Sequence, residues 1–405
     1  MTAVSPKRLA DFIPTVASRK TSLKSWDLSQ IPTGELLPST RMALRSKSCS
    51  PDAPNMIVQI TSFSCGSMSV GIAITHGLAD AQSMCTFAKD WASVSRAIHS
   101  SVPLPDITPV FNPNLLDMAA SGDIDAHAPD ISLVEEARNL PGHRFDWYRE
   151  VPGQPWPVHT PDDFDATAIL SPSVPIPWAD WDTKAPSSGR VLHFTGREIQ
   201  NMFEHANTDP SRSDISKHDA LLAHLWSRIN HARQLPDGTL THLDLTIGLR
   251  PRLALPPNFL GSPITILAVP SSISTSTPPS TAALAAEIRS HLNRFTPSAI
   301  GALLHDAAFE VSPQRLWRAF LGRKHVLQTS WVQSGFQEVR FVSGASLRYV
   351  QPEMGGDGLL LVMESLGDER GGHWTSNGAD VLVFLETAAM TRLLADTKLW
   401  PEDVI

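Results

Sequence analysis

The chain has 405 residues, of which 42% are hydrophobic and 18% charged, and its formal net charge is −8. A chain of this length exceeds what one hydrophobic core commonly supports, so we expect a globular protein of two domains. The acidic balance excludes a general attraction to nucleic acid or to anionic membrane surfaces. No apolar run approaches the roughly 20 residues that span a bilayer, so we expect no membrane partner.

The three cysteines are Cys49, Cys65 and Cys85. Their spacing is not that of a metal site, and any disulfide scheme leaves one of them unpaired. Reduced thiols in the cytoplasm are the simplest interpretation. The histidines are scattered without a recognisable ligand spacing, so the sequence predicts no metal site. The first residues lack the apolar segment of a leader sequence.

Two apolar runs rich in β-branched residues, 56–63 and 68–75, flank the tetrapeptide Ser-Cys-Gly-Ser. They predict two strands joined by a turn. The second run ends at His76-Gly77, where glycine lets the backbone turn sharply and leaves the imidazole at the exit of the strand. A helical pattern begins at Ala81. An imidazole at such a corner is a candidate general base, because its ordinary pKa lies close to neutral pH.

The spacing His-x-x-x-Asp occurs three times, beginning at His76, His159 and His205. His159 lies in a proline-interrupted acidic loop and His205 precedes a turn, so we interpret both as solvated histidines. Only His76 combines an apolar strand, a glycine corner and an amphipathic helix. The spacing alone is a weak signal, and the alternative for His76 is a structural histidine.

Residues 100–189 are crowded with proline, aspartate and tryptophan and show little periodicity, apart from a helical pattern near 133–140. Because proline removes backbone donors and tryptophan needs cover, we expect an ordered segment that wraps over a surface. A disordered linker is the alternative, which the number of aromatic residues disfavours.

Beyond this segment, hydrophobic periodicity predicts both strands and helices. Strands are expected at 190–195, 243–249, 326–332, 337–342, 346–350, 359–365 and 381–385, and helices at 197–207, 217–233, 282–293, 299–309, 313–321 and 387–395. The helix 217–233 follows the capping-box pattern Ser216-x-x-Asp219 and is apolar around much of its surface. We therefore expect it to be buried against a sheet.

Three features occur in a characteristic order: the segment around His76, the helix that begins Ser216-Lys-His-Asp, and Gly248-Leu-Arg-Pro-Arg252 followed by Pro256-Pro-Asn-Phe-Leu-Gly261. In this order they resemble the BAHD acyltransferase family of plants and fungi, in particular its fungal branch of secondary metabolism. The resemblance implies an α/β fold of two mixed-sheet domains, each like chloramphenicol acetyltransferase, with the active site in a channel between them. Acyl-CoA would enter one end of the channel and the acceptor the other.

The resemblance also implies a division of the chain. Residues 1–186 would form an N-terminal domain that carries the catalytic motif and ends in a proline-rich crossover segment, about 100–186. Residues 187–405 would form the C-terminal domain. In the family the motif histidine usually lies further from the start of the chain, so we expect this chain to lack the opening strand and helix.

By resemblance, His76 is the catalytic base and Asp80 is structural at the site. In the family this carboxylate turns away from the histidine and pairs with an arginine of the second domain, which corresponds here to Arg250, with Arg252 as second choice. Two alternatives stay open. Asp80 could orient His76 as a dyad, and the two arginines could merely solvate the end of a strand.

The second family signature, Asp-Phe-Gly-Trp-Gly, falls on residues 340–344, of which only Phe341 and Gly344 match it. This loop is structural in the family, so its substitution affects the expected shape of the channel more than the chemistry. Ser330-Trp331 matches the Ser-Trp that precedes the family's loop. Ser330, Trp331 and Gly344 are therefore predicted to bind substrate, although Trp331 could equally belong to the core.

The implied activity is transfer of an acyl group from acyl-CoA, with acetyl-CoA as the expected donor, to a hydroxyl or amine of a small secondary metabolite. Acyl-CoA would be a co-substrate and no cofactor would be permanently bound. We expect a cytoplasmic monomer with small-molecule partners. The alternatives are a relative that takes acyl groups from a carrier protein, whose condensation-domain pattern fails here at Thr75 and Ala81, and a non-catalytic binding paralogue.

Overall fold

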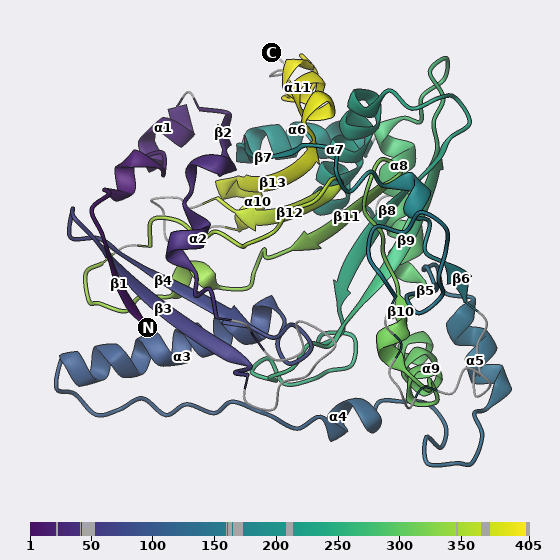
Figure 1. Cartoon of the computed structure of the whole chain (residues 1–405), viewed down its shortest axis with the longest axis horizontal. Helices are drawn as coiled ribbons and strands as arrows, with labels where there is room; N and C mark the ends of the chain where they lie inside the picture. Colours follow the sequence, from purple (N-terminus) through teal and green to yellow (C-terminus); the bar gives the residue numbers. More distant parts are fainter. Residues whose placement is uncertain are drawn as a thin grey trace.

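In the computed structural model of the chain, the described residues are 1–21, 23–40, 42, 53–158, 160, 164, 173–207, 214–345, 347–365 and 373–401. Cys49 and His159 lie outside them. The described residues form a mixed α/β structure with three sheets (Figure 1). Among the described helices, none combines the length and apolar character needed to cross a membrane.

The largest sheet has seven strands in the order β2-β7-β13-β12-β11-β8-β9. Their bounds are β2 Ser25–Asp27, β7 Ser187–Phe194, β8 Leu240–Gly248, β9 Ile264–Ser272, β11 His325–Ser330, β12 Leu359–Glu364 and β13 Ala379–Glu386. Strand β11 runs parallel to both of its neighbours, and the other neighbouring pairs are antiparallel. The continuous apolar runs of β12 and β13 are buried, as expected for central strands covered on both faces.

Helices α6 (Gly196–Ala206), α7 (Lys217–Arg233), α8 (Thr281–Asn293) and α11 (Thr387–Ala395) lie together on one side of this sheet (Figure 1). Helix α7 begins at the predicted capping box, in which Ser216 and Asp219 satisfy each other's backbone N–H groups. Its side chains Leu221, Trp226 and Ile229 are almost completely buried and form the centre of the main core. The predicted helix 217–233 is confirmed.

A smaller sheet orders β1 (Thr2–Ser5), β3 (Met56–Phe63) and β4 (Met68–Ile74). The hairpin between β3 and β4 turns at Gly66, whose φ of +79° favours glycine. Helix α3 (Ala81–His99) follows and lies beside this sheet (Figure 1).

The start of the chain differs from our expectation that an opening strand and helix are absent. Strand β1 pairs in parallel with β3, helix α1 spans Val16–Thr21, and β2 pairs with β7 of the large sheet. The expectation was wrong because it rested on the position of the motif histidine along the chain. Strand β2 gives no clear sequence signal, since it is only three residues long.

The crossover segment is ordered over its described residues, as predicted. After α3 it runs as an extended chain through α4 (Asn114–Asp117) and α5 (Ile131–Arg138), then supplies β5 (Phe145–Asp146) and β6 (Val174–Pro175) to a sheet with β10 (Leu316–Trp317). Aromatic rings hold it in place: Trp147, Trp156, Trp178 and Trp181 pack edge to face or stacked on one another and on Phe320. The tryptophans are therefore cover for a surface, as expected.

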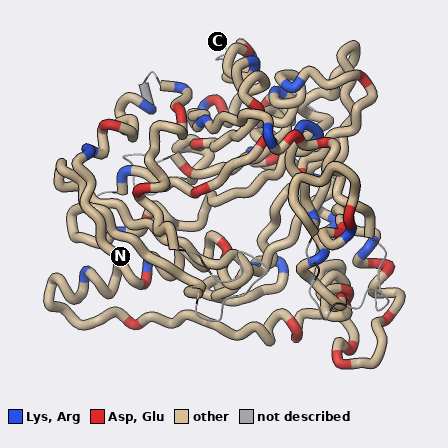
Figure 2. The backbone as a smooth tube through the Cα atoms, viewed as in Figure 1, with Lys and Arg blue, Asp and Glu red and all other residues tan. Residues whose placement is uncertain are grey.

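The first part of this segment carries acidic residues but no lysine or arginine. Between Arg96 and Arg138 the sequence contains no lysine or arginine. Figure 2 shows this stretch along the lower edge of the molecule, marked by acidic residues. An anionic ligand would be repelled there.

Three predicted elements are wrong. The helix expected at 313–321 is a short 3-10 turn (Pro313–Arg315) followed by β10, because Leu316-Trp317 pairs with β5 of the crossover segment. The strand expected at 337–342 is a 3-10 turn (Phe336–Glu338) and an irregular loop. Likewise the described residues 347–350 form no strand. Strand β9 was not predicted, and helix α9 (Pro297–Ala308) agrees with the predicted helix 299–309.

Candidate active site

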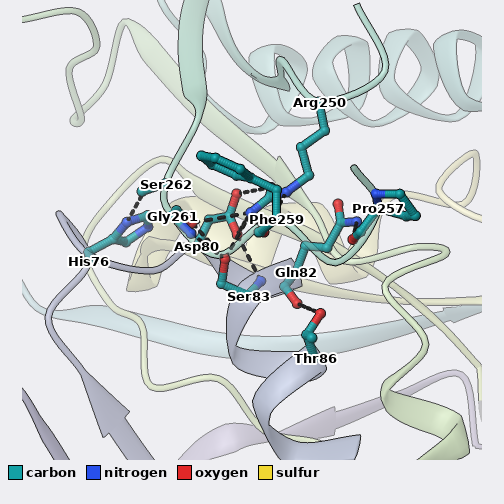
Figure 3. Close-up of polar contacts among 10 residues, drawn as sticks. All are labelled: His76, Asp80, Gln82, Ser83, Thr86, Arg250, Pro257, Phe259, Gly261 and Ser262. Carbon is teal, nitrogen blue, oxygen red and sulfur yellow. Dashed lines mark hydrogen bonds and ion pairs between the residues drawn. The ribbon is translucent and has the colours of Figure 1, made fainter. Parts of the chain in front are cut away.

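His76 lies in the turn that follows β4, exposed to solvent. Its Nδ1 is 3.3 Å from the hydroxyl oxygen of Ser262, which comes from the loop before β9 (Figure 3). The imidazole therefore lies at the corner that the sequence predicted. Its contact with Ser262 joins the strand–turn–helix unit to a segment nearly two hundred residues further along the chain.

Asp80 is the N-cap of α3, and its Oδ1 accepts the backbone N–H of Ser83 at 2.9 Å. The same carboxylate pairs with Arg250, at 3.0 Å from Nη2 to Oδ1 and 2.5 Å from Nη1 to Oδ2. Only 7% of Asp80 and 4% of Arg250 are exposed. A carboxylate at a helix N-terminus also interacts favourably with the helix dipole. The predicted contact between Asp80 and Arg250 is confirmed.

The guanidinium of Arg250 also donates hydrogen bonds to the segment that follows it in the chain and to Ser83 of α3. Its Nε and Nη2 donate to the carbonyl of Phe259, and Nη2 also donates to the carbonyl of Gly261 and to Ser83 Oγ. Its charge lies 5.8 Å from the centre of the Phe259 ring. Five donors in a fixed fork suit such a site, so lysine could not replace Arg250 here.

Ser83 completes the joint from the side of α3. Its hydroxyl donates to the carbonyl of Gly261 at 2.7 Å and accepts the N–H of Gly261 at 2.9 Å. The N–H of Asp80 also donates to that carbonyl, at 3.1 Å. Figure 3 shows these contacts converging from α3 and from the segment that contains Phe259 and Gly261, with His76 to one side. The start of α3 is thereby fastened to the loop that contains Ser262.

The arrangement decides between the two interpretations of Asp80. Both of its carboxylate oxygens are engaged by Arg250, and the polar contact recorded for the His76 ring is with Ser262. A His76–Asp80 dyad is therefore not formed. Arg252, the second choice, contacts the carbonyl of Gly248 instead.

The second group of predicted site residues lies at the end of β11. The N–H of Trp331 donates to the carbonyl of Val362 at 2.8 Å, and its ring stacks on Phe336 with centroids 5.0 Å apart. Ser330 precedes it on the strand. Trp331 is half-buried, packs on a core cluster and borders a pocket of about 30 Å³. Its packing role is thus observed, and a role in substrate binding stays a prediction.

The loop that carries the substituted second signature packs on α3. The ring of Phe341 lies edge-on to Trp91, 4.7 Å between centroids, and Lys89 pairs with Glu338 at 2.8 Å. The tip of the loop, residues 342–345, is exposed. Gly344 lies there with φ +79°, and a side chain added to it would meet open space. Gly344 is therefore required for the turn and not for close packing.

Cys85 lies on the buried face of α3 and is completely buried. Burial raises the pKa of its thiol to about 11, so the nucleophilic thiolate is disfavoured at neutral pH. Our interpretation of Cys85 as a packing residue agrees with this position. His205, at the end of α6, is exposed and its Nδ1 contacts the carbonyl of Asn201 at 2.7 Å.

Two polar residues of the site were not anticipated from the sequence. Ser83 stands three residues after Asp80, a spacing typical of a helix start, and could have been found as the partner of an N-cap. Ser262 gives no such signal. It reaches His76 only because the segment 256–261 folds back onto α3. The described residues also contain one group with metal-ligand chemistry, His143, Asp244 and His325, outside this site.

Comparisons with known proteins agree with the resemblance. The model of a family described as the Transferase family matches residues 16–138. The acyltransferase AFT15-1 of Alternaria alternata is 26% identical over 84% of this chain and 66% of its own length. The acyltransferase abl6 of Leptosphaeria maculans is 25% identical over 93% of this chain and 72% of its own length.

A solved structure of similar fold is that of F. graminearum TRI101 in complex with coenzyme A and deoxynivalenol. It superposes with a TM-score of 0.64 at 14% identity, over 98% of this chain and 80% of TRI101. At this identity the likeness shows the fold alone. It supports the two-domain α/β fold expected from the sequence. This chain is thus shorter than the relatives it matches.

Proposed function

Since the chain belongs to the BAHD acyltransferase family, we propose that it transfers an acyl group from acyl-CoA to a hydroxyl or amine of a small secondary metabolite. We take acetyl-CoA as the first donor to test. The observation that carries the proposal is the exposed imidazole of His76 at the end of β4. The nearby carboxylate of Asp80 binds Arg250 with both oxygens and is not a partner of this imidazole.

His76 is proposed as the general base. A hydrogen bond from Nδ1–H to Ser262 Oγ would leave the lone pair on Nε2, on the far side of the ring. Nε2 would accept the proton of the acceptor as its oxygen or nitrogen attacks the thioester carbonyl. The carbon–sulfur bond then breaks, and His76 returns the proton to the coenzyme A thiolate. A base in this position contributes a factor of about 100 to 10,000.

Asp80 and Arg250 are proposed as positioning residues. They touch neither substrate in this mechanism, but their ion pair and the Ser83 bridges fix the turn that carries His76 against the loop that carries Ser262. Holding both substrates beside a fixed base is the larger contribution, because well-oriented reactants gain on the order of 7 kcal/mol in favourable cases.

The acyl-CoA is proposed to bind in a channel between the two domains, 1–186 and 187–405. Ser330, Trp331 and Gly344 are assigned to this channel by resemblance. The coenzyme would approach from a side other than the segment 97–137, since that stretch is acidic and contains no lysine or arginine. We further propose that the protein acts as a cytoplasmic monomer.

The proposal is tested by incubating the protein with radiolabelled acetyl-CoA and a small-metabolite extract of the source organism. Label should move to a small molecule and free coenzyme A should appear in equal amount. A control without extract measures thioester hydrolysis. Label that moves only from an acylated carrier protein would favour the carrier-dependent alternative. No transfer from any acyl donor, with binding of a small molecule intact, would favour a binding paralogue.

A further inference from the structure

Buried carboxylates in this chain follow a consistent rule. Among the described residues, eight acidic residues are buried as whole residues: Asp80, Asp146, Glu198, Asp219, Asp244, Asp306, Asp357 and Asp380. All but Asp244 form an ion pair with an arginine or a lysine. Asp244, which is 0% exposed, has ion-pair partners that are imidazoles alone, those of His143 and His325.

The surroundings of Asp244 therefore differ from those of the other buried carboxylates. A buried carboxylate is costly unless its partners compensate the lost hydration. The ion-pair partners of Asp244 are two imidazoles, and imidazole is a common metal ligand as well as a hydrogen-bond donor. The cluster thus gathers one carboxylate and two imidazoles, a donor set that can hold a metal ion.

The donor atoms of the three residues lie close enough together to share a single ion. His143 Nε2 lies 2.9 Å from Asp244 Oδ1, and His325 Nδ1 lies 2.9 Å from Oδ2. One ligand atom from each of the three residues lies within 4.8 Å of the others. Donors bound at about 2.0–2.2 Å to one ion in a tetrahedral site are roughly 3.3–3.6 Å apart, a few tenths of an ångström more than these two contacts. The backbone N–H of Phe320 donates to Oδ2 and so orients the carboxylate.

A fourth nitrogen is available beside the cluster. The ring of His242 stacks on His325 with centroids 4.9 Å apart and lies edge-on to His143 at 4.8 Å. Its Nδ1 is buried and has no hydrogen-bond partner among the described residues. This unpartnered nitrogen, on a ring in contact with both histidines of the cluster, is the candidate for a fourth ligand.

We propose that His143, Asp244 and His325, with His242 as fourth ligand, bind one divalent transition-metal ion, with Zn²⁺ as the best match. Imidazole and carboxylate donors in a four-ligand set suit Zn²⁺. The ligands come from the crossover segment ahead of β5, from β8 and from β11, at the position where His325 and His242 are register partners. The ion therefore fastens the crossover segment to the large sheet, and its role is structural.

The test uses the full chain purified without a polyhistidine tag, treated with a chelator, and then supplied with Zn²⁺ or Co²⁺. After removal of free metal, elemental analysis should find about one equivalent per chain. The melting temperature should rise with metal and return with chelator. The Co²⁺ form should show the visible absorption of a low-symmetry site.

Variants identify the ligands. His143→Gln and Asp244→Asn should lose the bound metal and the metal-dependent rise in melting temperature. His193→Gln is the matched control, because His193 is also buried against a carboxylate, Asp380, which already has Arg19 as partner. It should retain the metal. If Asp244→Asn does not fold, the partly exposed His143 still decides, since its side chain is 13% exposed at the edge of the cluster.

Two results would overturn the proposal. One is a wild-type protein that retains no metal and whose melting temperature does not respond to Zn²⁺ or Co²⁺, which would mean that the cluster is held by its hydrogen bonds alone. The other is retention of one equivalent by His143→Gln and Asp244→Asn alike, which would place the metal elsewhere.

Discussion

The carboxylate of Asp80 performs two structural tasks with the same two oxygens. It accepts the N–H of Ser83 at the start of α3, and it binds the guanidinium of Arg250 from 170 residues further along the chain. The separation of these tasks matters for mutagenesis, because a cap needs only a hydrogen-bond acceptor and an ion pair needs the charge. Asparagine supplies the first without the second.

We expect Asp80→Asn to keep the helix cap and lose the ion pair, and Asp80→Ala to lose both. Removing one member of a buried pair leaves an unpaired charge and costs roughly 3–5 kcal/mol of unfolding free energy. Asp80→Ala should cost about 1 kcal/mol more than Asp80→Asn. Both should reduce turnover because they loosen the turn that carries His76. Denaturant unfolding of the variants measures the two losses.

An exposed pair provides the control for this prediction. Lys7 and Glu35 lie 2.8 Å apart, with side chains 43% and 54% exposed. Surface pairs of this kind contribute roughly 0–1 kcal/mol. Glu35→Gln should therefore leave the unfolding free energy almost unchanged. A loss for Asp80→Asn no larger than that for Glu35→Gln would contradict the structural role given to the Asp80–Arg250 pair.

At the scale of elements, segments from the C-terminal part of the chain contact α3 at its start and at its middle. Its start is fastened to the segment 256–262, and its middle is covered by the loop 335–345 through Trp91–Phe341 and Lys89–Glu338. The loop differs from the family signature at Arg340, Val342 and Ser343, of which the last two lie at its exposed tip.

We predict that this exposed tip weakens the apparent affinity for acetyl-CoA or shifts the preference to longer acyl chains. A tryptophan missing from the channel wall would leave space that a longer acyl chain fills. The measurement is a series of acyl-CoA donors of increasing chain length with one fixed acceptor. Phe341→Ala, which removes the anchor on α3, should broaden the preference further. Tight use of acetyl-CoA alone would show that the substituted loop rebuilds the usual pocket.

The elements that the sequence predicted well are those with a strong local period. Helix α7 was found with its bounds because a capping box and a nearly continuous apolar surface agree with each other. Residues 313–321 also have a helical pattern, yet Leu316-Trp317 pairs with β5. The neighbouring Arg315 forms an ion pair with Asp146 of the crossover segment, which supports this pairing. Tertiary contacts of this kind leave no trace in a local pattern.

The candidate site shows the same division. The corner at His76 and the pairing of Asp80 with Arg250 could be anticipated, the first from a strand, a glycine and a helix in succession, and the second from the family resemblance. Ser262 could not, since a serine in a loop carries no signal of its partner. The cluster around Asp244 was also missed, because its histidines, His143, His242 and His325, are 99 and 83 residues apart in the chain (242 − 143 and 325 − 242). The register of β8 and β11 and the return of the crossover segment bring them together.

At the scale of the whole molecule, the chain crosses between its two parts more than once. Strand β2 joins the large sheet, and the crossover segment returns to contribute β5 and β6 beside β10. The core cluster around Trp26 contains residues from both ends of the chain, such as Phe12 and Leu382. This second core cluster spans the two parts, so we expect their unfolding to be coupled.

The central claim, that His76 is the base of an acyl transfer, is tested most directly by the turnover of His76→Ala with both substrates saturating. We predict a loss of at least about 100-fold, with an unchanged melting temperature because His76 is exposed. His205→Ala, which removes an exposed histidine of the same His-x-x-x-Asp spacing, should behave as wild type. Turnover of His76→Ala close to that of wild type would contradict the general-base assignment.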